Sequence, residues 1–412
     1  MMRKKYTLTF LIFAGFFLGL LAGWLVGESI IPWAEPMKDI FLRLLRMAIL
    51  PLIITSIISA VIQVGSGRGL GRIGLRTMVY YLSTSLLAIF TGQILVNIFK
   101  PGKGANIGLE NAPETIGAVD QSIGELLINI IPENPFEAMA NGDVLPVIFF
   151  SILFGFFVTQ LKREQKDLLG NVFKAAFEAM LKLTSFIIWS APIGVFGIIA
   201  VIVARDGFGS FISLGKYFLI VLIGLSIHFF ITLPLILKFI GKTSPVVHYR
   251  GMLSALMTAF TTCSTIVTLP LTMKAVTEVS GASKKAAGFV LPIGATINMD
   301  GTALYECVAT IFIAQVYGFD LSLAQQGIIV LTAVLASIGA ASVPMSGMVM
   351  MSIILTAVGL PLEGVGIILA VDRVLDMFRT TVNVYSDSVG AVVISQLEGE
   401  LNQAEGEEKS AG

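Results

Sequence analysis

Charged side chains are scarce in this sequence. Asp, Glu, Lys and Arg make up only 13% of its 412 residues, whereas a soluble domain is about a quarter charged. The 27 basic residues balance the 27 acidic ones, which argues against a basic surface for nucleic acid. With 55% hydrophobic residues and a mean hydropathy of +0.88, this scarcity predicts a membrane protein.

Cysteine and histidine are nearly missing too. Cys263 and Cys307 both lie in apolar surroundings, which argues against a disulfide framework and equally against a thiolate metal site. The only histidines are His228 and His248, and the sequence contains no visible Ser–His–Asp or metal-ligand cluster. His228 lies within an apolar run, where a packed structural histidine is the better interpretation. These gaps argue against an enzyme.

Long apolar runs dominate the first 240 residues. The run from Leu8 to Val26 has full membrane length and no small-residue cleavage site after it, so we expect a transmembrane helix and not a removed signal peptide. Five more runs follow, near 40–65, 77–98, 144–161, 184–204 and 214–240. A cytoplasmic N-terminus would place every basic connection between them on the cytoplasmic side. The basic residues concerned are Arg68, Arg72, Arg76, Lys162, Arg163, Lys166, Lys238, Lys242 and Arg250.

Two later apolar segments are broken near their middle. Segment 251–280 contains the polar run 261–265 and Pro270, and segment 325–357 contains several Ser, Gly and Pro residues between 337 and 347. Each arm, of about 10 to 15 residues, is too short to cross a bilayer, and a non-helical tip at membrane depth must be buried in protein or line a cavity. We interpret both segments as re-entrant helical hairpins, although two kinked helices are the alternative.

A membrane helix containing polar residues follows each hairpin, at 285–316 and 364–394. Two such units suggest an inverted repeat with a site at the middle of the membrane, which is the plan of many secondary transporters. The polar, acidic tail from Glu398 is expected to be disordered.

The segment 371–390 carries a stripe of polar residues within an apolar run. Their spacing places all of them on one helical face, and ionisable groups in hydrocarbon usually face a bundle interior or a watery cavity. We interpret this stripe as a site for a small charged solute and its ions; the alternative is an internal ion-pair network. The stripe consists of Asp372, Asp376, Arg379, Thr380, Asn383 and Asp387.

The run 294–302 should interrupt a helix, because Asn, Asp and Gly all weaken helices. Freed carbonyls, with the carboxylates of Asp300 and Asp387, would suit a hard cation such as sodium, and no calcium loop of EF-hand spacing is present. A polar kink is the alternative. Arg379 can pair a carboxylate bidentately, and Asp376 can pair an ammonium. Half-helix N-termini at the hairpin tips would favour an anionic group.

Several sequence motifs resemble those of a known protein family. They are NMDGTALY at 298–305, GLP at 359–361, LDMFRTTVNVYSD at 375–387, RLLRMAILPLI at 43–53, VYYLSTS at 79–85 and NGDVLP at 141–146. They closely resemble the dicarboxylate/amino acid:cation symporter family, which includes the excitatory amino acid transporters and the archaeal aspartate transporters. The resemblance covers almost the whole chain.

The resemblance implies an all-α membrane protein with eight transmembrane helices, two re-entrant hairpins and inverted repeats. It also implies a homotrimer in which a transport domain slides against a scaffold as an elevator. The implied division is scaffold helices 1–2 in 1–75, transport-domain helix 3 in 76–98, scaffold helices 4–5 in 99–205, transport-domain helix 6 in 206–250, hairpin 1 in 251–284, helix 7 in 285–320, hairpin 2 in 321–360, helix 8 in 361–396 and a disordered tail in 397–412.

The resemblance also implies the binding residues. Arg379, helped by Thr302, would hold the substrate side-chain carboxylate, Asp376 the amino group and Asn383 the α-carboxylate, with Thr380 beside them. Backbone of Thr265, Val343 and Gly347 at the hairpin tips would also touch substrate. One sodium site would use Asp387 and Asn383 with carbonyls of Gly294 and Asn298, and a second Thr84, Ser85, Asn298 and Asp300, with Tyr81 nearby. A third would use carbonyls of Thr296, Ser337, Ile338 and Ala340, and Met299 is counted with these cation positions.

Two departures from the family pattern stand out, and one further position is notable. The first hairpin tip has bulky β-branched residues at 265–268, and an arginine that the family carries at one of two positions is replaced by Cys263 and Met377. Glu306 matches a glutamate of the animal transporters that is a possible proton carrier; the alternative is an ordinary buried acid that is hydrogen-bonded to a neighbour.

We therefore expect a sodium-coupled importer of acidic amino acids, aspartate or glutamate, in a prokaryotic inner membrane. The partners would be this substrate, Na⁺ and the lipid bilayer. One alternative is the same fold carrying a neutral amino acid or a plain dicarboxylate; Arg379 opposes the first and Asp376 the second. Another is an anion channel or a solute sensor, which would not need intact sodium positions.

Overall fold

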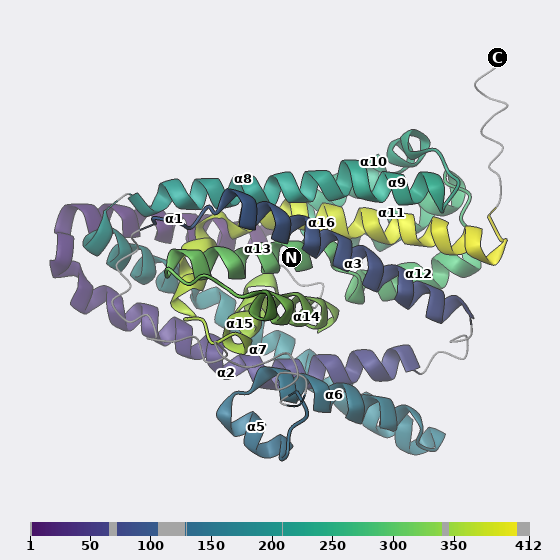
Figure 1. Cartoon of the computed structure of the whole chain (residues 1–412), viewed down its shortest axis with the longest axis horizontal. Helices are drawn as coiled ribbons and strands as arrows, with labels where there is room; N and C mark the ends of the chain where they lie inside the picture. The colour runs from purple at the N-terminus through teal and green to yellow at the C-terminus, as the bar shows by residue number, and fades with distance from the viewer. Residues whose placement is uncertain are drawn as a thin grey trace.

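The structure is a computed structural model, and it describes residues 2–65, 72–105, 128, 130–207, 209–339 and 346–401. All regular structure in these ranges is helical (Figure 1). The elements are α1 (Met2–Val26), η1 (Gly27–Ile30), α2 (Ile31–Gly65), α3 (Arg72–Phe99), α5 (Pro135–Asn141), α6 (Val144–Thr159), α7 (Arg163–Asp206), α8 (Gly209–Ile227), η2 (His228–Thr232), α9 (Leu233–Phe239), α10 (Pro245–Thr262), α11 (Thr265–Glu278), α12 (Lys284–Ile297), α13 (Asp300–Val316), α14 (Leu323–Gly339), α15 (Ser346–Ala357) and α16 (Glu363–Glu398).

Four helical stretches of the described chain are long and apolar enough to cross a membrane. They are Phe10–Ile62, which runs through α1 and α2, then Arg72–Phe99, Arg163–Arg205 and Ile212–Phe239. The predicted run 144–161 is the shorter apolar helix α6, and the predicted run 184–204 is the second half of the 44-residue helix α7. Two basic connections are also helical in part, because Arg72 and Arg76 lie in α3 and Arg163 and Lys166 in α7.

Small residues set the packing of α1 on α7. Gly15, Gly19 and Gly23 are spaced four residues apart, so that they line one face of α1. A Cβ at Gly23 would lie 2.7 Å from the carbonyl oxygen of Ala200. Such small residues let two apolar helices approach closely. This close packing matters in a membrane, because lipid provides no hydrophobic driving force between helices.

One of the two predicted breaks in the later apolar segments lies within the described residues. Between α10 and α11 the backbone turns at Cys263, with a φ of 49°, and at Ser264, whose hydroxyl accepts a hydrogen bond from Val267 N at 3.4 Å. α10 and α11 pack against each other, as do α14 and α15. The connection between α14 and α15, 340–345, lies outside the described residues.

The predicted interruption near 298 separates α12 from α13. Asn298 and Met299 have non-helical backbone angles, with ψ of 91° and 54°. α13 then restarts at Asp300 and is buried along nearly its whole length. This break therefore brings three polar residues, Asn298, Asp300 and Thr302, into the interior.

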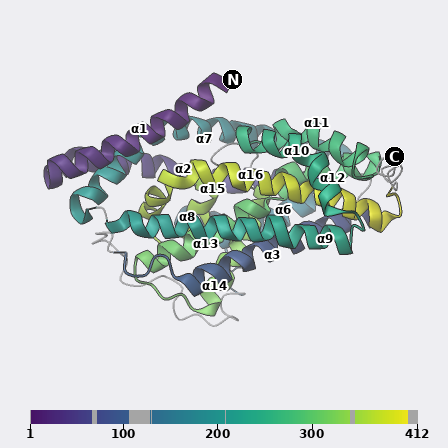
Figure 2. The ribbon, with the colours of Figure 1, turned by 90° about the horizontal axis from the view of Figure 1, so that it is seen from above.

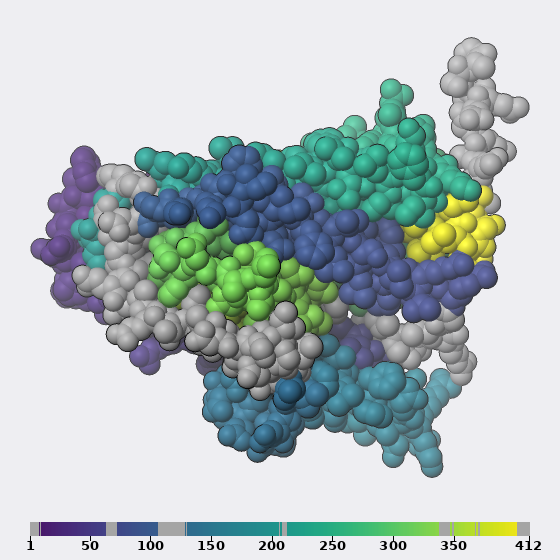
Figure 3. Space-filling view, viewed as in Figure 1, coloured from purple at the N-terminus to yellow at the C-terminus, as the bar shows by residue number. Residues whose placement is uncertain are grey.

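α16 runs along the middle of this part of the molecule. Figure 2 shows it between α10 and α11 on one side and α8 and α9 on the other, and it contacts all four. On the face seen in Figure 3, α16 reaches the surface chiefly at its C-terminal end. The polar face of α16 is therefore enclosed by other helices.

The C-terminal end of α16 is tied down by ion pairs. Glu398 accepts from Arg72 Nη2 at 2.9 Å and from Arg76 Nη1 at 2.7 Å, and Arg76 also donates to the carbonyl of Leu397. Glu400 pairs with Lys285 at 2.6 Å. The helix thus reaches two residues beyond the predicted boundary, and 399–401 are described, whereas the rest of the predicted disordered tail, 402–412, lies outside the described residues.

These pairs predict an acid-sensitive end of α16. The Arg72 hydrogen bond and charge, with Arg76, lower the pKa of Glu398 below its usual 4.5. A lowered folded-state pKa stabilises the folded protein above pH 4.5, and this stabilisation is lost as pH falls through the folded-state pKa. We expect Glu398→Gln to lower the melting temperature in detergent at pH 7, with a difference from wild type that shrinks below about pH 4.5.

Glu278→Gln is the matched control, since the ion pair of Glu278 within the described ranges is an exposed one with Lys274 at 3.9 Å. A Glu398→Gln difference that stayed constant from pH 7 to pH 4 would contradict the role of the charge.

Candidate substrate and cation site

The predicted polar stripe of α16 is buried. Asp372, Asp376, Arg379, Thr380, Asn383 and Asp387 are each at most 8% exposed. Since an isolated buried charge is costly, the partners of each group decide what the site can bind.

Arg379 is the centre of the first cluster. Its Nη2 lies 3.0 Å from Asp372 Oδ1 and 3.2 Å from Asp376 Oδ1, and its Cζ lies 3.8 Å above the ring centre of Tyr305. The ion-pair alternative is thus present in part, because Arg379 pairs with acids of its own helix. However, Nε and Nη1 are buried and have no hydrogen-bond partner among the described residues, so two donors of the guanidinium remain available to a ligand.

Small and polar groups lie beside these donors. A Cβ on Gly347, in the first turn of α15, would lie 2.5 Å from Arg379 Nη1. Asn383 Nδ2 donates to Thr302 Oγ1 at 3.2 Å, and Asn383 Oδ1 accepts from Gly301 N at 2.8 Å. The structure therefore brings Arg379, Asp376, Asn383, Thr302 and Gly347 together from three helices.

Asp300 is the centre of a second cluster. Its Oδ1 accepts from Ser85 Oγ at 2.7 Å and Thr84 Oγ1 at 3.3 Å. Its Oδ2 accepts from Ser386 Oγ at 2.6 Å and lies 3.1 Å from His228 Nε2. Of the residues predicted for one sodium site, Thr84 and Ser85 thus contact Asp300 directly. Asn298 is instead linked to it through Ser386, to whose Oγ its Nδ2 donates at 3.0 Å.

Asp387 forms a third group beside the α12–α13 break. Asn298 Nδ2 donates to Asp387 Oδ1 at 2.9 Å, and a Cβ on Gly294 would collide with that carboxylate and lie 2.7 Å from the hydroxyl of Tyr81. Asn298 Oδ1 is buried and has no partner among the described residues. Carboxylate, amide and carbonyl oxygens in one place are the donors that a hard cation prefers.

The remaining predicted positions lie near the helix ends. Thr265 is buried, and its Oγ1 donates to the carbonyl of Ala295 at 2.7 Å, which joins the start of α11 to α12. Thr296, near the end of α12, and Ser337 and Ile338, near the end of α14, belong to helices that contact each other. Val343 and Ala340 lie outside the described residues.

Sequence reasoning missed two residues of the Asp300 cluster and one of the Arg379 cluster. His228 was interpreted as a packed residue of an apolar run, but it lies in the π-helical turn η2, a feature that is frequent at functional sites, and it contacts Asp300. Ser386 lies seven residues after Arg379, at the edge of the face that carries the stripe, so helical spacing could have found it. Arg373, whose Nη1 lies 3.4 Å from Asp376 Oδ2, is three residues before Asp376 and also lies at the edge of that face.

Glu306 on α13 is completely buried, and neither of its carboxylate oxygens has a hydrogen-bond partner among the described residues. The structure therefore argues against the alternative in which a neighbouring group holds this acid by a hydrogen bond.

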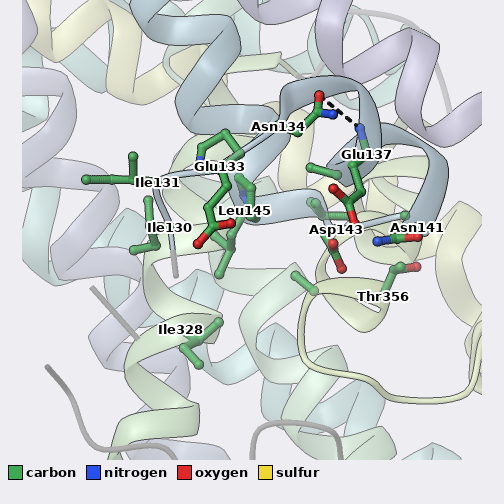
Figure 4. Close-up of a pocket in the computed structure, with 16 residues that line it drawn as sticks. Ile130, Ile131, Glu133, Asn134, Glu137, Asn141, Asp143, Leu145, Ile328 and Thr356 are labelled. Carbon is green, nitrogen blue, oxygen red and sulfur yellow. Dashed lines mark hydrogen bonds between the residues drawn. The ribbon is translucent and has the colours of Figure 1, made fainter. Parts of the chain in front are cut away.

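A separate cavity of about 500 Å³ lies beside α5 (Figure 4). Glu133, Glu137 and Asp143 contribute carboxylates to its lining, together with Ile328 and Thr356 from α14 and α15. It contains none of the predicted site residues. The clusters around Arg379, Asp300 and Asp387 remain the candidate site.

Apolar helices of membrane length surround a buried site that contains both acidic and basic side chains. This arrangement is typical of polytopic membrane proteins that bind a small charged solute. Comparison with known proteins narrows the class. The profile of the sodium:dicarboxylate symporter family matches residues 8–397, and the chain belongs to this family. It is therefore a transporter and not an enzyme.

Relatives support this membership along nearly the full length. The chain is 35% identical to the proton/sodium-glutamate symport protein of Geobacillus stearothermophilus over 98% of both chains. It is 35% identical to the proton/glutamate-aspartate symporter of Escherichia coli over 98% of this chain and 95% of the relative. It is 37% identical to excitatory amino acid transporter 1 of Ambystoma tigrinum over 87% of this chain and 76% of the relative.

Proposed function

We propose that this protein is a sodium-coupled symporter that imports acidic amino acids, aspartate or glutamate. The observation that carries the proposal is the buried Arg379, which has two nitrogens without a hydrogen-bond partner among the residues that the structure describes and lies beside the carboxylate of Asp376. A guanidinium fork suits a carboxylate, and a carboxylate suits an ammonium. An acidic amino acid offers both groups, and Thr302, Thr380 and Asn383 add polar contacts for its second carboxylate.

Sodium is proposed as the co-transported substrate. Asp387, Asn383, Asn298 and Gly294 would supply one oxygen cage, and Asp300, Thr84 and Ser85 another. Each carboxylate would offset part of the cation's lost hydration. Each cage shares a helix with the substrate groups, because Asp387 and Asn383 lie on α16 and Asp300 lies on α13. Binding of sodium would therefore order the helix break that also holds Thr302.

We further propose eight transmembrane helices and two re-entrant hairpins, formed by α10–α11 and α14–α15, arranged as inverted repeats. The transport domain would comprise α3, α8–α9 and everything from α10 to α16, and would move as an elevator against a scaffold of α1, α2, α6 and α7. The assembly would be a homotrimer in a prokaryotic inner membrane, with the N-terminus in the cytoplasm.

The alternatives differ from this proposal either in the substrate that is carried or in whether its movement is coupled to sodium. A carrier of neutral amino acids would leave Arg379 without a carboxylate, and a carrier of plain dicarboxylates would leave Asp376 without an ammonium. A channel or sensor would bind the solute without coupling it to sodium.

The test is uptake of labelled aspartate into liposomes that contain the purified protein. We expect accumulation with an inward sodium gradient and none with choline in its place. Equal uptake in the two media would overturn the proposal, and preferential uptake of alanine or succinate would favour the alternatives.

Glu306 is proposed as a proton carrier. A buried carboxyl without a partner is costly to ionise, so its protonation would accompany one of the two half-cycles. We expect Glu306→Gln to flatten the dependence of net uptake on pH between about 5.5 and 8.5, while sodium-dependent aspartate exchange continues. Superimposable pH profiles for wild type and mutant would leave Glu306 as a structural residue.

A further inference from the structure

Arg373 is a second arginine at the substrate site, for which the proposed function has no use. Its side chain is 9% exposed, and Nη1 lies 3.4 Å from Oδ2 of Asp376. The other oxygen of Asp376, Oδ1, lies 3.2 Å from Nη2 of Arg379. Both oxygens of this carboxylate are therefore engaged by arginines, three residues before and three residues after it on α16.

The two arginines are held differently. Arg379 also contacts Asp372 at 3.0 Å and the ring of Tyr305 at 3.8 Å, and it is 1% exposed. Among the described residues, Arg373 forms an ion pair with Asp376 alone, and this contact is the longer of the two. The bond from Arg373 is therefore the one that a ligand can exchange, while Arg379 stays in place.

We propose that Arg373 sets specificity by competing with the substrate ammonium for Asp376. This inference rests on the proposed function and deepens it. When an acidic amino acid binds, its ammonium replaces Arg373 at Oδ2 of Asp376. A dicarboxylate without an amine has nothing to offer Asp376, so the Arg373 contact survives its binding.

The consequence is a ratio that can be measured. Loss of the Arg373 charge weakens the attraction of both ligands' carboxylates to a similar extent. The same loss also frees Asp376 from Arg373, and this benefits only the ligand whose ammonium binds Asp376. The preference for aspartate over succinate should therefore rise, although both ligands carry two carboxylates.

The experiment is isothermal calorimetry of L-aspartate and succinate on the purified full chain in sodium. We expect Arg373→Gln to raise the ratio of the two affinities about tenfold, the lower end expected for one charged hydrogen bond. Arg373→Lys, which keeps the charge without the fork, should give an intermediate ratio. Arg46→Gln is the matched control, since Arg46 pairs with Glu363 near the start of the same helix at 3.2 Å, and it should leave the ratio unchanged.

A double-mutant cycle separates this role from a structural one. In the Asp376→Asn background, Arg373→Gln should no longer change the ratio, because the contested carboxylate is gone. The proposal is overturned if wild type binds aspartate in a sodium-dependent manner while Arg373→Gln leaves the ratio unchanged, or if the same change appears without Asp376. If Arg373→Gln does not fold, Arg373→Lys decides, and a wild-type ratio there rejects the proposal. Wild-type protein without sodium-dependent aspartate binding would reject the proposed function itself.

Discussion

Arg379→Cys should abolish measurable binding of aspartate and glutamate. The guanidinium supplies two buried nitrogens that have no hydrogen-bond partner in the part of the chain that the structure describes, and each hydrogen bond to a charged group contributes about 1.5–3 kcal/mol. Loss of both predicts an affinity at least about 100-fold weaker. Cysteine is smaller than arginine and carries no positive charge to pair with a ligand carboxylate. Small neutral amino acids should therefore bind better to the variant than to the wild type.

The measurement is calorimetry in sodium, with serine and alanine beside the acidic ligands. Removing Arg379 also leaves Asp372 and Asp376 without their shared cation, so the melting temperature of each variant must be recorded. Arg379→Lys keeps that cation and loses only the planar fork. We expect it to fold like the wild type and to bind aspartate more weakly. Unchanged aspartate affinity in either variant would remove Arg379 from the substrate site.

The sequence was most informative where the physical pattern was local. The stripe on α16 could be predicted because a period of 3.6 residues and the cost of buried charge both act along one helix. The breaks at Cys263–Ser264 and Asn298–Met299 could be predicted because Asn, Ser and Thr compete with helical hydrogen bonds. The motif resemblance then assigned residues on other helices, which periodicity cannot reach.

Contacts between distant segments were the hardest to predict. His228 is 72 residues from Asp300 in the sequence and lies in an apolar run, so that nothing local links the two. Arg373, by contrast, lies only three residues before Asp376 and seven before Thr380, so helical spacing alone could have included it in the stripe. The length of α7 was also missed, since 163–183 is too polar to read as a membrane span but is a good helix former.

Contacts from distant segments also distinguish two carboxylates, Asp300 and Asp387, that look equivalent in sequence. Asp300 has hydroxyl or imidazole neighbours at both oxygens, whereas Asp387 has one amide donor, Asn298 Nδ2. A carboxylate with fewer donors has more lone pairs left for a cation. Asp387 is therefore the residue at which removal of the charge should weaken sodium binding most.

We expect Asp387→Asn to raise the sodium concentration for half-maximal aspartate uptake by about tenfold or more. The substitution keeps the size of the side chain and removes one formal charge from a buried site, where a charged contact contributes about 1.5–3 kcal/mol. Because sodium and substrate are coupled, the apparent aspartate affinity should fall at low sodium and recover as sodium is raised.

That recovery distinguishes a cation ligand from a residue that merely supports the fold. Sodium titrations of uptake in liposomes, at fixed internal volume and protein density, provide the measurement. Asp320→Asn is the control, since Asp320 is an exposed carboxylate in the connection between α13 and α14. An Asp387→Asn protein with a wild-type sodium dependence would exclude Asp387 as a ligand. A loss of aspartate affinity that persisted at saturating sodium would assign it a structural role, because added cation cannot restore a misplaced helix.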